Sequence, residues 1–284
     1  MIPVQFDYLA PTTLEEAVAA LSQHGDDAKI LAGGQSLLPV LRMRLNAPEV
    51  LIDLGRIPSL RGVRDDGDAI VIGAMTEHSV VGSDPLVAEH AGLVAKAVEH
   101  LADAQIRHRG TFGGALAHAD PAGDLGGPVL ALGGEFVVTG SGGTRTVPAS
   151  EFFTGLFETA IGDDEILTEV RIPKHTGWGA HHAKFVRIAH QWPIVAVAAT
   201  VRVSGGVIEE AKIALANMGS TPLRASAVES ALAGAAITAE AVGAAAEHAA
   251  DGTSPPSDLN GDAEYRKHLA RVLTRRAVLA AAGA

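Results

Sequence analysis

The chain has 284 residues, which is long enough to bury the cores of two or three domains. Hydrophobic residues make up 47% and charged residues 19% of it, a balance typical of globular proteins and not of disordered ones. The formal net charge of -11 argues against nucleic acid as a partner, since that requires clustered lysine and arginine, and against docking on an anionic membrane surface.

The chain contains no cysteine. It therefore forms no disulfide, offers no thiol nucleophile and cannot hold an iron–sulfur cluster through thiolates. Redox chemistry would need a bound organic cofactor or a metal in another subunit. The longest apolar run, residues 193–201, is too short to cross a bilayer, so we do not expect an integral membrane protein. The first residues lack the pattern of a signal peptide, and we expect a cytoplasmic location.

Residues 1–55 predict a small α/β unit. Thr12 or Thr13 can cap a helix that Gly25 can end. Beyond it the pattern predicts, in chain order, a strand, a helix and a strand: residues 28–34, 37–45 and 49–55.

Residues 56–175 predict a larger α+β unit. One continuous amphipathic helix is expected over residues 86–102. Asp120 can cap another helix with Pro121 at its first position. The strands expected here are residues 69–76, a hairpin over residues 135–152 and residues 164–173.

Residues 176–284 predict a third unit, and the glycine-containing stretch 174–179 before it is a candidate hinge. We interpret His181 and His182 as a surface pair. Three antiparallel strands are expected ahead of alanine-rich helices: residues 181–188, 194–203 and 206–218.

Two of the six Gly-Gly pairs differ from the others in their flanks. The pair 33–34 follows an apolar strand and precedes Ser36, whereas the pair 113–114 follows Thr111 and leads toward a second helix. A diphosphate must be met by several backbone amides, and a Cβ on the loop would block that approach. Glycine also permits positive φ, so that successive N–H groups can point into one concavity. We predict that both loops close on one diphosphate from opposite sides, with the two hydroxyls donating to its oxygens.

Tight turns at strand ends are the alternative explanation for both glycine pairs. Neither the phosphate loop of NTPases nor the Gly-x-Gly-x-x-Gly dinucleotide pattern occurs in the chain. His118, Asp120 and Asp124 lie close in sequence, but their spacing is not that of zinc or calcium ligands. We therefore expect no metal site.

The segments AGGQSLLPVLRMRL, residues 32–45, and RGTFGGALAHADPAGD, residues 109–124, resemble the FAD-binding medium subunit of molybdenum hydroxylases. This family includes carbon monoxide dehydrogenase, whose medium chain the sequence resembles most, and the flavin domain of xanthine dehydrogenase. The resemblance extends over nearly the whole chain. It implies an α+β fold, with a two-subdomain FAD-binding fold of the PCMH or vanillyl-alcohol-oxidase type and a C-terminal three-stranded antiparallel sheet with helices.

The resemblance also implies non-covalent FAD between the first two units. Residues 30–37 would surround the diphosphate, and Asp124 would accept hydrogen bonds from ribose or adenosine hydroxyls. Lys184 would lie at the isoalloxazine edge, and Trp192 could cover a flavin face or pack between domains. The predicted cofactor-binding residues are Ile30, Leu31, Ala32, Gly33, Gly34, Gln35, Ser36, Leu37, Leu101, Thr111, Gly113, Gly114, His118, Asp120, Asp124, Leu167, Lys184 and Trp192.

In this family the substrate is oxidised at a molybdenum centre in a large subunit, and electrons cross iron–sulfur clusters of a small subunit to the flavin. The resemblance thus implies that molybdopterin and [2Fe–2S] clusters lie only in partner subunits and that this chain carries no catalytic residue. It further implies a dimer of heterotrimers and an external acceptor, which is a quinone, NAD or oxygen. Through the complex, a loose association with the inner face of the membrane is compatible with the family.

Two positions depart from the family pattern. Gln35 stands where carbon monoxide dehydrogenases commonly carry histidine, and Ala115 where many members carry asparagine. Neither change removes a backbone donor, but Gln35 weakens the assignment of one substrate. Three alternatives therefore stay open: a medium subunit for xanthine, nicotine or aromatic acyl-CoA substrates, a self-contained FAD oxidase or reductase, and a non-catalytic assembly module.

Overall fold

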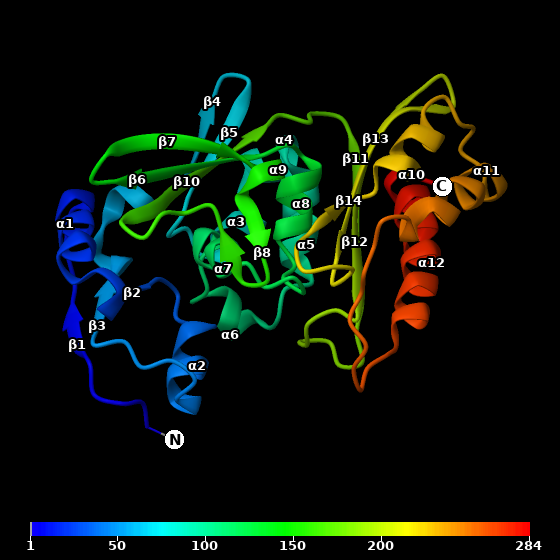
Figure 1. Ribbon diagram of the computed structural model, residues 1–284. Coiled ribbons are helices and arrows are strands. Elements are labelled where there is room, and N and C mark those ends of the chain that lie inside the picture. Colours follow the sequence, from blue (N-terminus) through cyan, green and yellow to red (C-terminus); the bar gives the residue numbers. More distant parts are fainter. Residues whose placement is uncertain (1) are drawn as a thin grey trace.

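Three sheets of three or more strands follow one another along the computed structural model, which describes residues 2–284 (Figure 1). The N-terminal sheet is parallel, with strand order β1-β3-β2. Its helix α1 packs Ala17 and Leu21 into a core shared with the sheet. The elements of this part are β1 (Asp7–Leu9), α1 (Leu14–His24), β2 (Ala28–Leu31), α2 (Leu37–Met43) and β3 (Val50–Asp53).

A capping box decides where α1 begins. The Thr13 hydroxyl accepts a hydrogen bond from the amide of Glu16, and the Glu16 carboxylate accepts from the amides of Thr12 and Thr13. These bonds satisfy amides that the first turn of a helix leaves without partners. Thr13, and not Thr12, is the cap, and Gly25 ends the helix with φ of 51°.

The central sheet is antiparallel, with strand order β4-β5-β10-β6-β7. The predicted hairpin is confirmed as β6 and β7, which turn through Ser141 and Gly142. The strands are β4 (Val63–Asp66), β5 (Ala69–Gly73), β6 (Glu135–Gly140), β7 (Gly143–Pro148) and β10 (Glu165–Pro173), and a small pair, β8 (Phe153–Gly155) and β9 (Glu158–Thr159), lies outside this sheet. The helices are α3 (His78–Ser83), α4 (Pro85–His90), α5 (Gly92–Glu99), α6 (Ala104–Arg107), α7 (Phe112–His118), α8 (Gly126–Ala131) and α9 (Ala149–Phe152).

The helix predicted over residues 86–102 is wrong in its continuity, because it breaks at Ala91 into α4 and α5. The carbonyl of His90 accepts a hydrogen bond from the amide of His175, 2.7 Å away, and so does not serve a following helical turn. The same bond packs the segment 174–178 against α4, and the His175 side chain is buried. The candidate hinge is therefore a packed connection.

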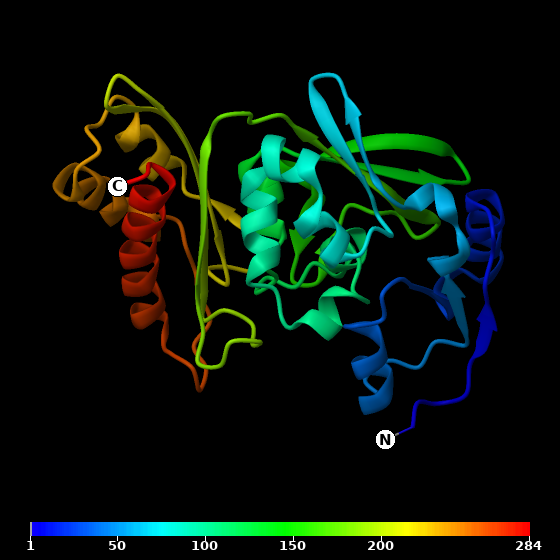
Figure 2. The same cartoon turned by 180° about the vertical axis from the view of Figure 1, so that it is seen from behind.

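The C-terminal sheet has strand order β11-β12-β13-β14 and is antiparallel. The three predicted strands are confirmed, and the two-residue β14 adds a fourth. Helix α12 packs on one face of the sheet and α5 and α8 on the other, where Gly127 lies against Ala198 and Ala214 (Figures 1 and 2). The elements are β11 (Gly179–Phe185), β12 (Val195–Ser204), β13 (Val207–Ala216), β14 (Leu223–Arg224), α10 (Ser226–Leu232), α11 (Ala239–Ala246) and α12 (Ala263–Ala281).

Within residues 2–284, no helix has the length and hydropathy that crossing a membrane requires. The same residues contain no group of three or more histidine, aspartate or glutamate side chains arranged to bind a metal ion.

We expect Thr13→Ala to lower the free energy of unfolding by about 1 kcal/mol, since the amide of Glu16 loses the hydroxyl that accepts its hydrogen bond. Ser22→Ala is the matched control, because this exposed serine removes a hydroxyl from the same helix without a cap. Chemical denaturation of both variants measures the difference. Equal stability of the two variants would show that the capping box contributes nothing.

Candidate functional site

The two glycine loops meet backbone to backbone. A methyl group on Gly33 would lie 2.4 Å from the carbonyl oxygen of Arg109 and 2.6 Å from the Cα of Gly110. A methyl group on Gly114 would lie 2.6 Å from the Thr111 hydroxyl oxygen. Real Cβ contacts are not this short, so only glycine permits the approach. The predicted proximity of the two loops is confirmed.

The first loop presents a run of amides without protein partners. Among residues 2–284, no acceptor takes a hydrogen bond from the backbone N–H groups of residues 33–36. Gly34 has φ of 74°. After the loop, the amide of Leu38 donates a hydrogen bond to the carbonyl of Gly34. Successive free amides around a residue of positive φ form a concavity suited to an anion. The loop therefore fits a diphosphate.

Ser36 lies at the junction of this loop with α2, as predicted. Its φ and ψ are already near helical values, and its hydroxyl caps no amide of the helix. The hydroxyl is thus free to donate to a ligand oxygen, in keeping with its predicted role.

The second loop uses its amides internally, which corrects one expectation. The Gly113 amide donates to the Ala74 carbonyl at 2.8 Å, and the Gly114 amide donates to the Thr111 hydroxyl at 3.2 Å. Neither glycine offers a free N–H to a diphosphate. Their missing side chains instead let the loop pack closely, since a methyl on Gly113 would lie 2.4 Å from the Ala74 Cβ. Thr111 keeps its own hydroxyl proton available for donation.

A buried histidine that the sequence analysis missed supports the second loop. The amide of His78 donates to the Gly110 carbonyl at 3.0 Å, and its ring contacts the position that a Gly110 side chain would occupy. Burial, with a smaller contribution from nearby Arg107, lowers the pKa of His78 to about 4. The ring is therefore neutral at pH 7, so it fills space behind the loop without adding charge.

Asp124 and Lys184 form a nearly buried ion pair between the central and C-terminal sheets. The Lys184 Nζ donates to Asp124 Oδ2 at 2.8 Å and to the carbonyl of His100 at 3.0 Å. Burial raises the pKa of Asp124 to about 6, and the nearby Lys184 ammonium opposes that rise. Asp124 Oδ1 is buried and has no partner among the described residues. Such an oxygen needs a donor, and a cofactor hydroxyl would satisfy it.

His182 lies beside this pair and not on the surface, so the expected surface pair is wrong for this residue. Its side chain is buried under α5, its ring stacks 6.2 Å from that of His100, and burial lowers its pKa to about 3. In β11 alternate side chains face opposite sides of the sheet, which places His182 and Lys184 on the same inward face. The alternation of side chains along the strand could therefore have predicted that His182 is buried.

Asp120 does not cap the helix that was predicted to begin at Pro121. Its carboxylate accepts from the amide of Ala122 at 2.9 Å, and the Gly123 amide donates to its carbonyl, so the segment forms a turn. The helix α8 begins only at Gly126, because a glycine two residues after the proline favours the turn.

The other predicted site residues fall into two groups. Ile30, Leu31 and Leu37 belong to the first loop and its flanks, while Leu101 and Leu167 are buried in the core. The ring centroids of His118 and Phe157 lie 5.1 Å apart, and Trp192 is 66% exposed on the loop between β11 and β12. The structure thus brings the two glycine loops together and, separately, pairs Asp124 with Lys184, whereas Trp192 lies in solvent.

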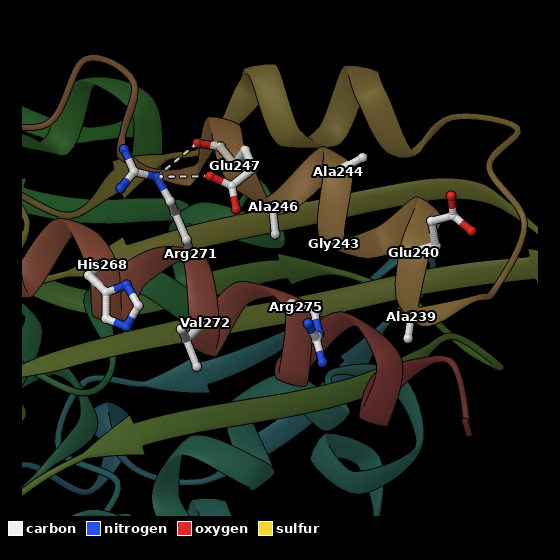
Figure 3. A pocket seen from close by; sticks show the side chains of 10 residues that line it. All are labelled: Ala239, Glu240, Gly243, Ala244, Ala246, Glu247, His268, Arg271, Val272 and Arg275. Atoms are coloured by element: carbon white, nitrogen blue, oxygen red, sulfur yellow. Dashed lines mark hydrogen bonds and ion pairs between the residues drawn. The ribbon is translucent and has the colours of Figure 1, made fainter.

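A separate hollow of about 470 Å³ lies between α11 and α12, far from the glycine loops in the chain (Figure 3). His268, Arg271 and Arg275 line it from α12, and Arg271 pairs with Glu247 at 3.6 Å. These side chains lie at the surface, and among the described residues no orphaned buried polar atom belongs to the lining of this hollow. The glycine loops therefore remain the candidate site.

The chain matches two family models in succession: the FAD binding domain in molybdopterin dehydrogenase over residues 4–175 and the CO dehydrogenase flavoprotein C-terminal domain over residues 180–281. The chain belongs to this family of FAD-binding dehydrogenase subunits. The predicted family, FAD cofactor, oxidoreductase class and α+β fold are confirmed.

Relatives match along almost their whole length. The carbon monoxide dehydrogenase medium chain of Hydrogenophaga pseudoflava is 43% identical, with 99% of this chain and 98% of the relative covered. The nicotine 6-hydroxylase medium subunit of Paenarthrobacter nicotinovorans is 39% identical, with 96% of each chain covered. The solved structure of the Hydrogenophaga pseudoflava carbon monoxide dehydrogenase that lacks the Mo-pyranopterin moiety superposes with a TM-score of 0.96, at 45% identity and with 100% and 99% of the chains covered.

We expect Gly33→Ala to abolish FAD retention, because the new methyl group would push the first loop away from the backbone of residues 109–111. Gly142→Ala is the matched control, since a side chain there meets nothing within 4 Å. Flavin absorbance of the purified proteins measures retention, and circular dichroism checks that each is folded. A folded Gly33→Ala protein with a full complement of FAD would contradict the clamp.

We expect FAD binding by the wild-type chain to weaken about tenfold between pH 7 and pH 5, as the Asp124 carboxylate gains its proton near pH 6. The ionised form is the one that accepts two hydrogen bonds, so affinity falls as the pH falls. Fluorescence titration with FAD across this range measures the effect. The Asp124→Asn variant should bind FAD more weakly at pH 7, and its affinity should not change between pH 7 and pH 5. If its affinity still fell over this range, the titration would belong to another group.

Proposed function

We propose that this chain is the FAD-bearing electron-transfer subunit of a molybdenum hydroxylase of the carbon monoxide dehydrogenase type. The observation that carries the proposal is the first glycine loop, whose unpartnered amides at residues 33–36 are backed by the backbone of residues 109–111. FAD would supply the redox chemistry, and the chain would bind and orient it.

The proposed cofactor-binding roles follow from the hydrogen-bond donors and acceptors that each residue has available for a ligand. The amides of residues 33–36 and the hydroxyls of Ser36 and Thr111 would donate to the diphosphate, and Asp124 Oδ1 would accept from a sugar hydroxyl. The Lys184 ammonium would stabilise negative charge near the ring. This set needs no cation at the diphosphate, which agrees with the net charge of -11.

We propose domain limits that would bring these groups around one space. We propose that residues 1–55 and 56–175 hold FAD between them and that residues 176–284 close the site through Lys184. The backbone contact of Gly33 with Gly110 and the ion pair of Lys184 with Asp124 support this division.

The partners are proposed on two grounds. The chain has no cysteine to hold the clusters that deliver electrons, and its relatives are named as medium chains or as a subunit of a dehydrogenase complex. We propose a large molybdenum-cofactor subunit and a small iron–sulfur subunit, assembled as a dimer of heterotrimers. Electrons would leave to a quinone, NAD or oxygen, from a complex located in the cytoplasm and loosely held at the inner face of the membrane.

Carbon monoxide is the proposed substrate of the partner, on the strength of the 43% identity to a carbon monoxide dehydrogenase medium chain. Because the chain is also 39% identical to a nicotine hydroxylase subunit, nicotine is the comparison substrate in the test.

The test is reconstitution with the two partner chains. We expect the isolated chain to bind FAD and to oxidise neither carbon monoxide nor nicotine, whereas the three-chain complex reduces a dye with carbon monoxide. Dye reduction by the isolated chain with either donor would contradict the electron-transfer role. If the complex were active with nicotine and inactive with carbon monoxide, the proposed substrate would be wrong.

A further inference from the structure

Arg107, the last residue of α6, folds back onto the segment that precedes this helix. Its Nη1 donates to the carbonyl of Leu101 at 2.8 Å and to the carbonyl of Ala102 at 3.5 Å. Both carbonyls lie just beyond the C-terminal end of α5, where the helical hydrogen-bond pattern no longer supplies donors. The half-buried Arg107 side chain supplies them instead.

The backbone of Ala102 depends on such support. Its φ is 43°, in the left-handed region that residues other than glycine rarely adopt. A non-glycine residue keeps this conformation only where the surrounding structure holds it there. The bonds from Arg107 hold the carbonyls on both sides of this strained position, so their loss would let residues 101–102 relax.

The same segment is bonded to the Asp124–Lys184 ion pair. The Lys184 Nζ donates to the His100 carbonyl at 3.0 Å and to Asp124 Oδ2 at 2.8 Å. The Lys184 side chain is only 4% exposed, so water competes little for these bonds. The position of the ammonium is therefore tied to that of residues 100–102.

Beyond the other end of α6, the chain packs on the first glycine loop. The Gly110 amide donates to the Ile106 carbonyl at 2.7 Å, and the backbone of residues 109–110 occupies the place that a Gly33 side chain would need. Residues 100–111 thus connect the ion pair to the glycine loops. Arg107 bonds one end of this connection to the other.

A cofactor that reaches both regions needs them at a fixed separation. In the proposed function, on which this inference rests, the diphosphate of FAD binds at the glycine loops and other groups of FAD reach the Asp124–Lys184 pair. We propose that Arg107 is a positioning residue, which fixes the separation of these two regions through its bonds to residues 101 and 102. Such preorganisation lowers the cost of binding one ligand at two places.

The test compares a ligand that spans both regions with one that reaches only the loops. FAD is the first probe, and inorganic pyrophosphate, which carries the diphosphate alone, is the second. Fluorescence titration of the three-chain complex, freed of its FAD, measures FAD affinity, and competition measures pyrophosphate affinity. Because glutamine is too short to replace the two bonds, we expect Arg107→Gln to weaken FAD binding about tenfold and pyrophosphate binding less than about twofold. Arg276→Gln, at an exposed arginine of α12, is the matched control and should change neither.

Two results with a folded Arg107→Gln complex would overturn the proposal. Equal weakening of both ligands would mean that Arg107 only supports the loops, and unchanged FAD binding would mean that it positions nothing. Arg107→Lys is the second variant, because it keeps the cation and a donor for the Leu101 carbonyl. We expect it to fold and to bind FAD within about threefold of the wild type, since one nitrogen makes both bonds. A tenfold loss in Arg107→Lys would overturn the assignment to these carbonyls.

The wild-type complex separates this inference from the one beneath it. If it bound no FAD, or if pyrophosphate did not compete with FAD, the proposed function or its diphosphate site would be contradicted. If it bound both ligands and Arg107→Gln bound FAD equally well, only the positioning role would be contradicted.

Discussion

The approach of Gly33 to the backbone of residues 109–111 is the constraint on which the rest of the site depends. With no side chain at this position, the first loop packs on the second through main-chain atoms alone. The amides of residues 33–36 have no protein acceptor among the described residues. A single added methyl group would separate the loops, and the concavity that suits a diphosphate would be lost with them.

Two regions that we assign to the cofactor differ in their electrostatics. The glycine loops offer neutral dipoles, which favour an anion without a bound cation and suit a chain of net charge -11. In the second region a buried lysine and aspartate compensate each other, and one carboxylate oxygen stays unpaired among the described residues. His78 and His182 pack behind these two regions as neutral rings, because burial holds the pKa of each far below 7. The chain is thereby equipped to hold and tune a redox cofactor.

Local sequence signals predicted local structure well. The capping pattern located α1, the glycine-rich turn located the β6–β7 hairpin, and alternation located three strands of the C-terminal sheet. Two of the failures came from contacts distant in sequence. The break between α4 and α5 depends on a carbonyl taken by His175, and the burial of His182 depends on α5 packing over β11.

In the candidate site too, features with a local sequence signal were predicted, and features that depend on distant residues were not. The two glycine pairs could be singled out from their flanks, and their meeting was predicted correctly. Which pair keeps its amides free could not be predicted, because it depends on Ala74, Thr76 and the Thr111 hydroxyl acting as acceptors for the second loop. The partnership of Asp124 with Lys184 spans 60 residues and left no local pattern. The individual roles of the predicted cofactor-binding residues stay predictions.

Hydrogen–deuterium exchange tests the central claim most directly, because it reads the amides themselves. In the cofactor-free chain, the amides of residues 33–36 should exchange fast and those of residues 112–114 slowly, since only the latter have protein acceptors among the described residues. Loading with FAD should slow exchange at residues 33–36 and leave residues 112–114 as they were. Unchanged exchange at residues 33–36 in a protein that has bound FAD would contradict the account.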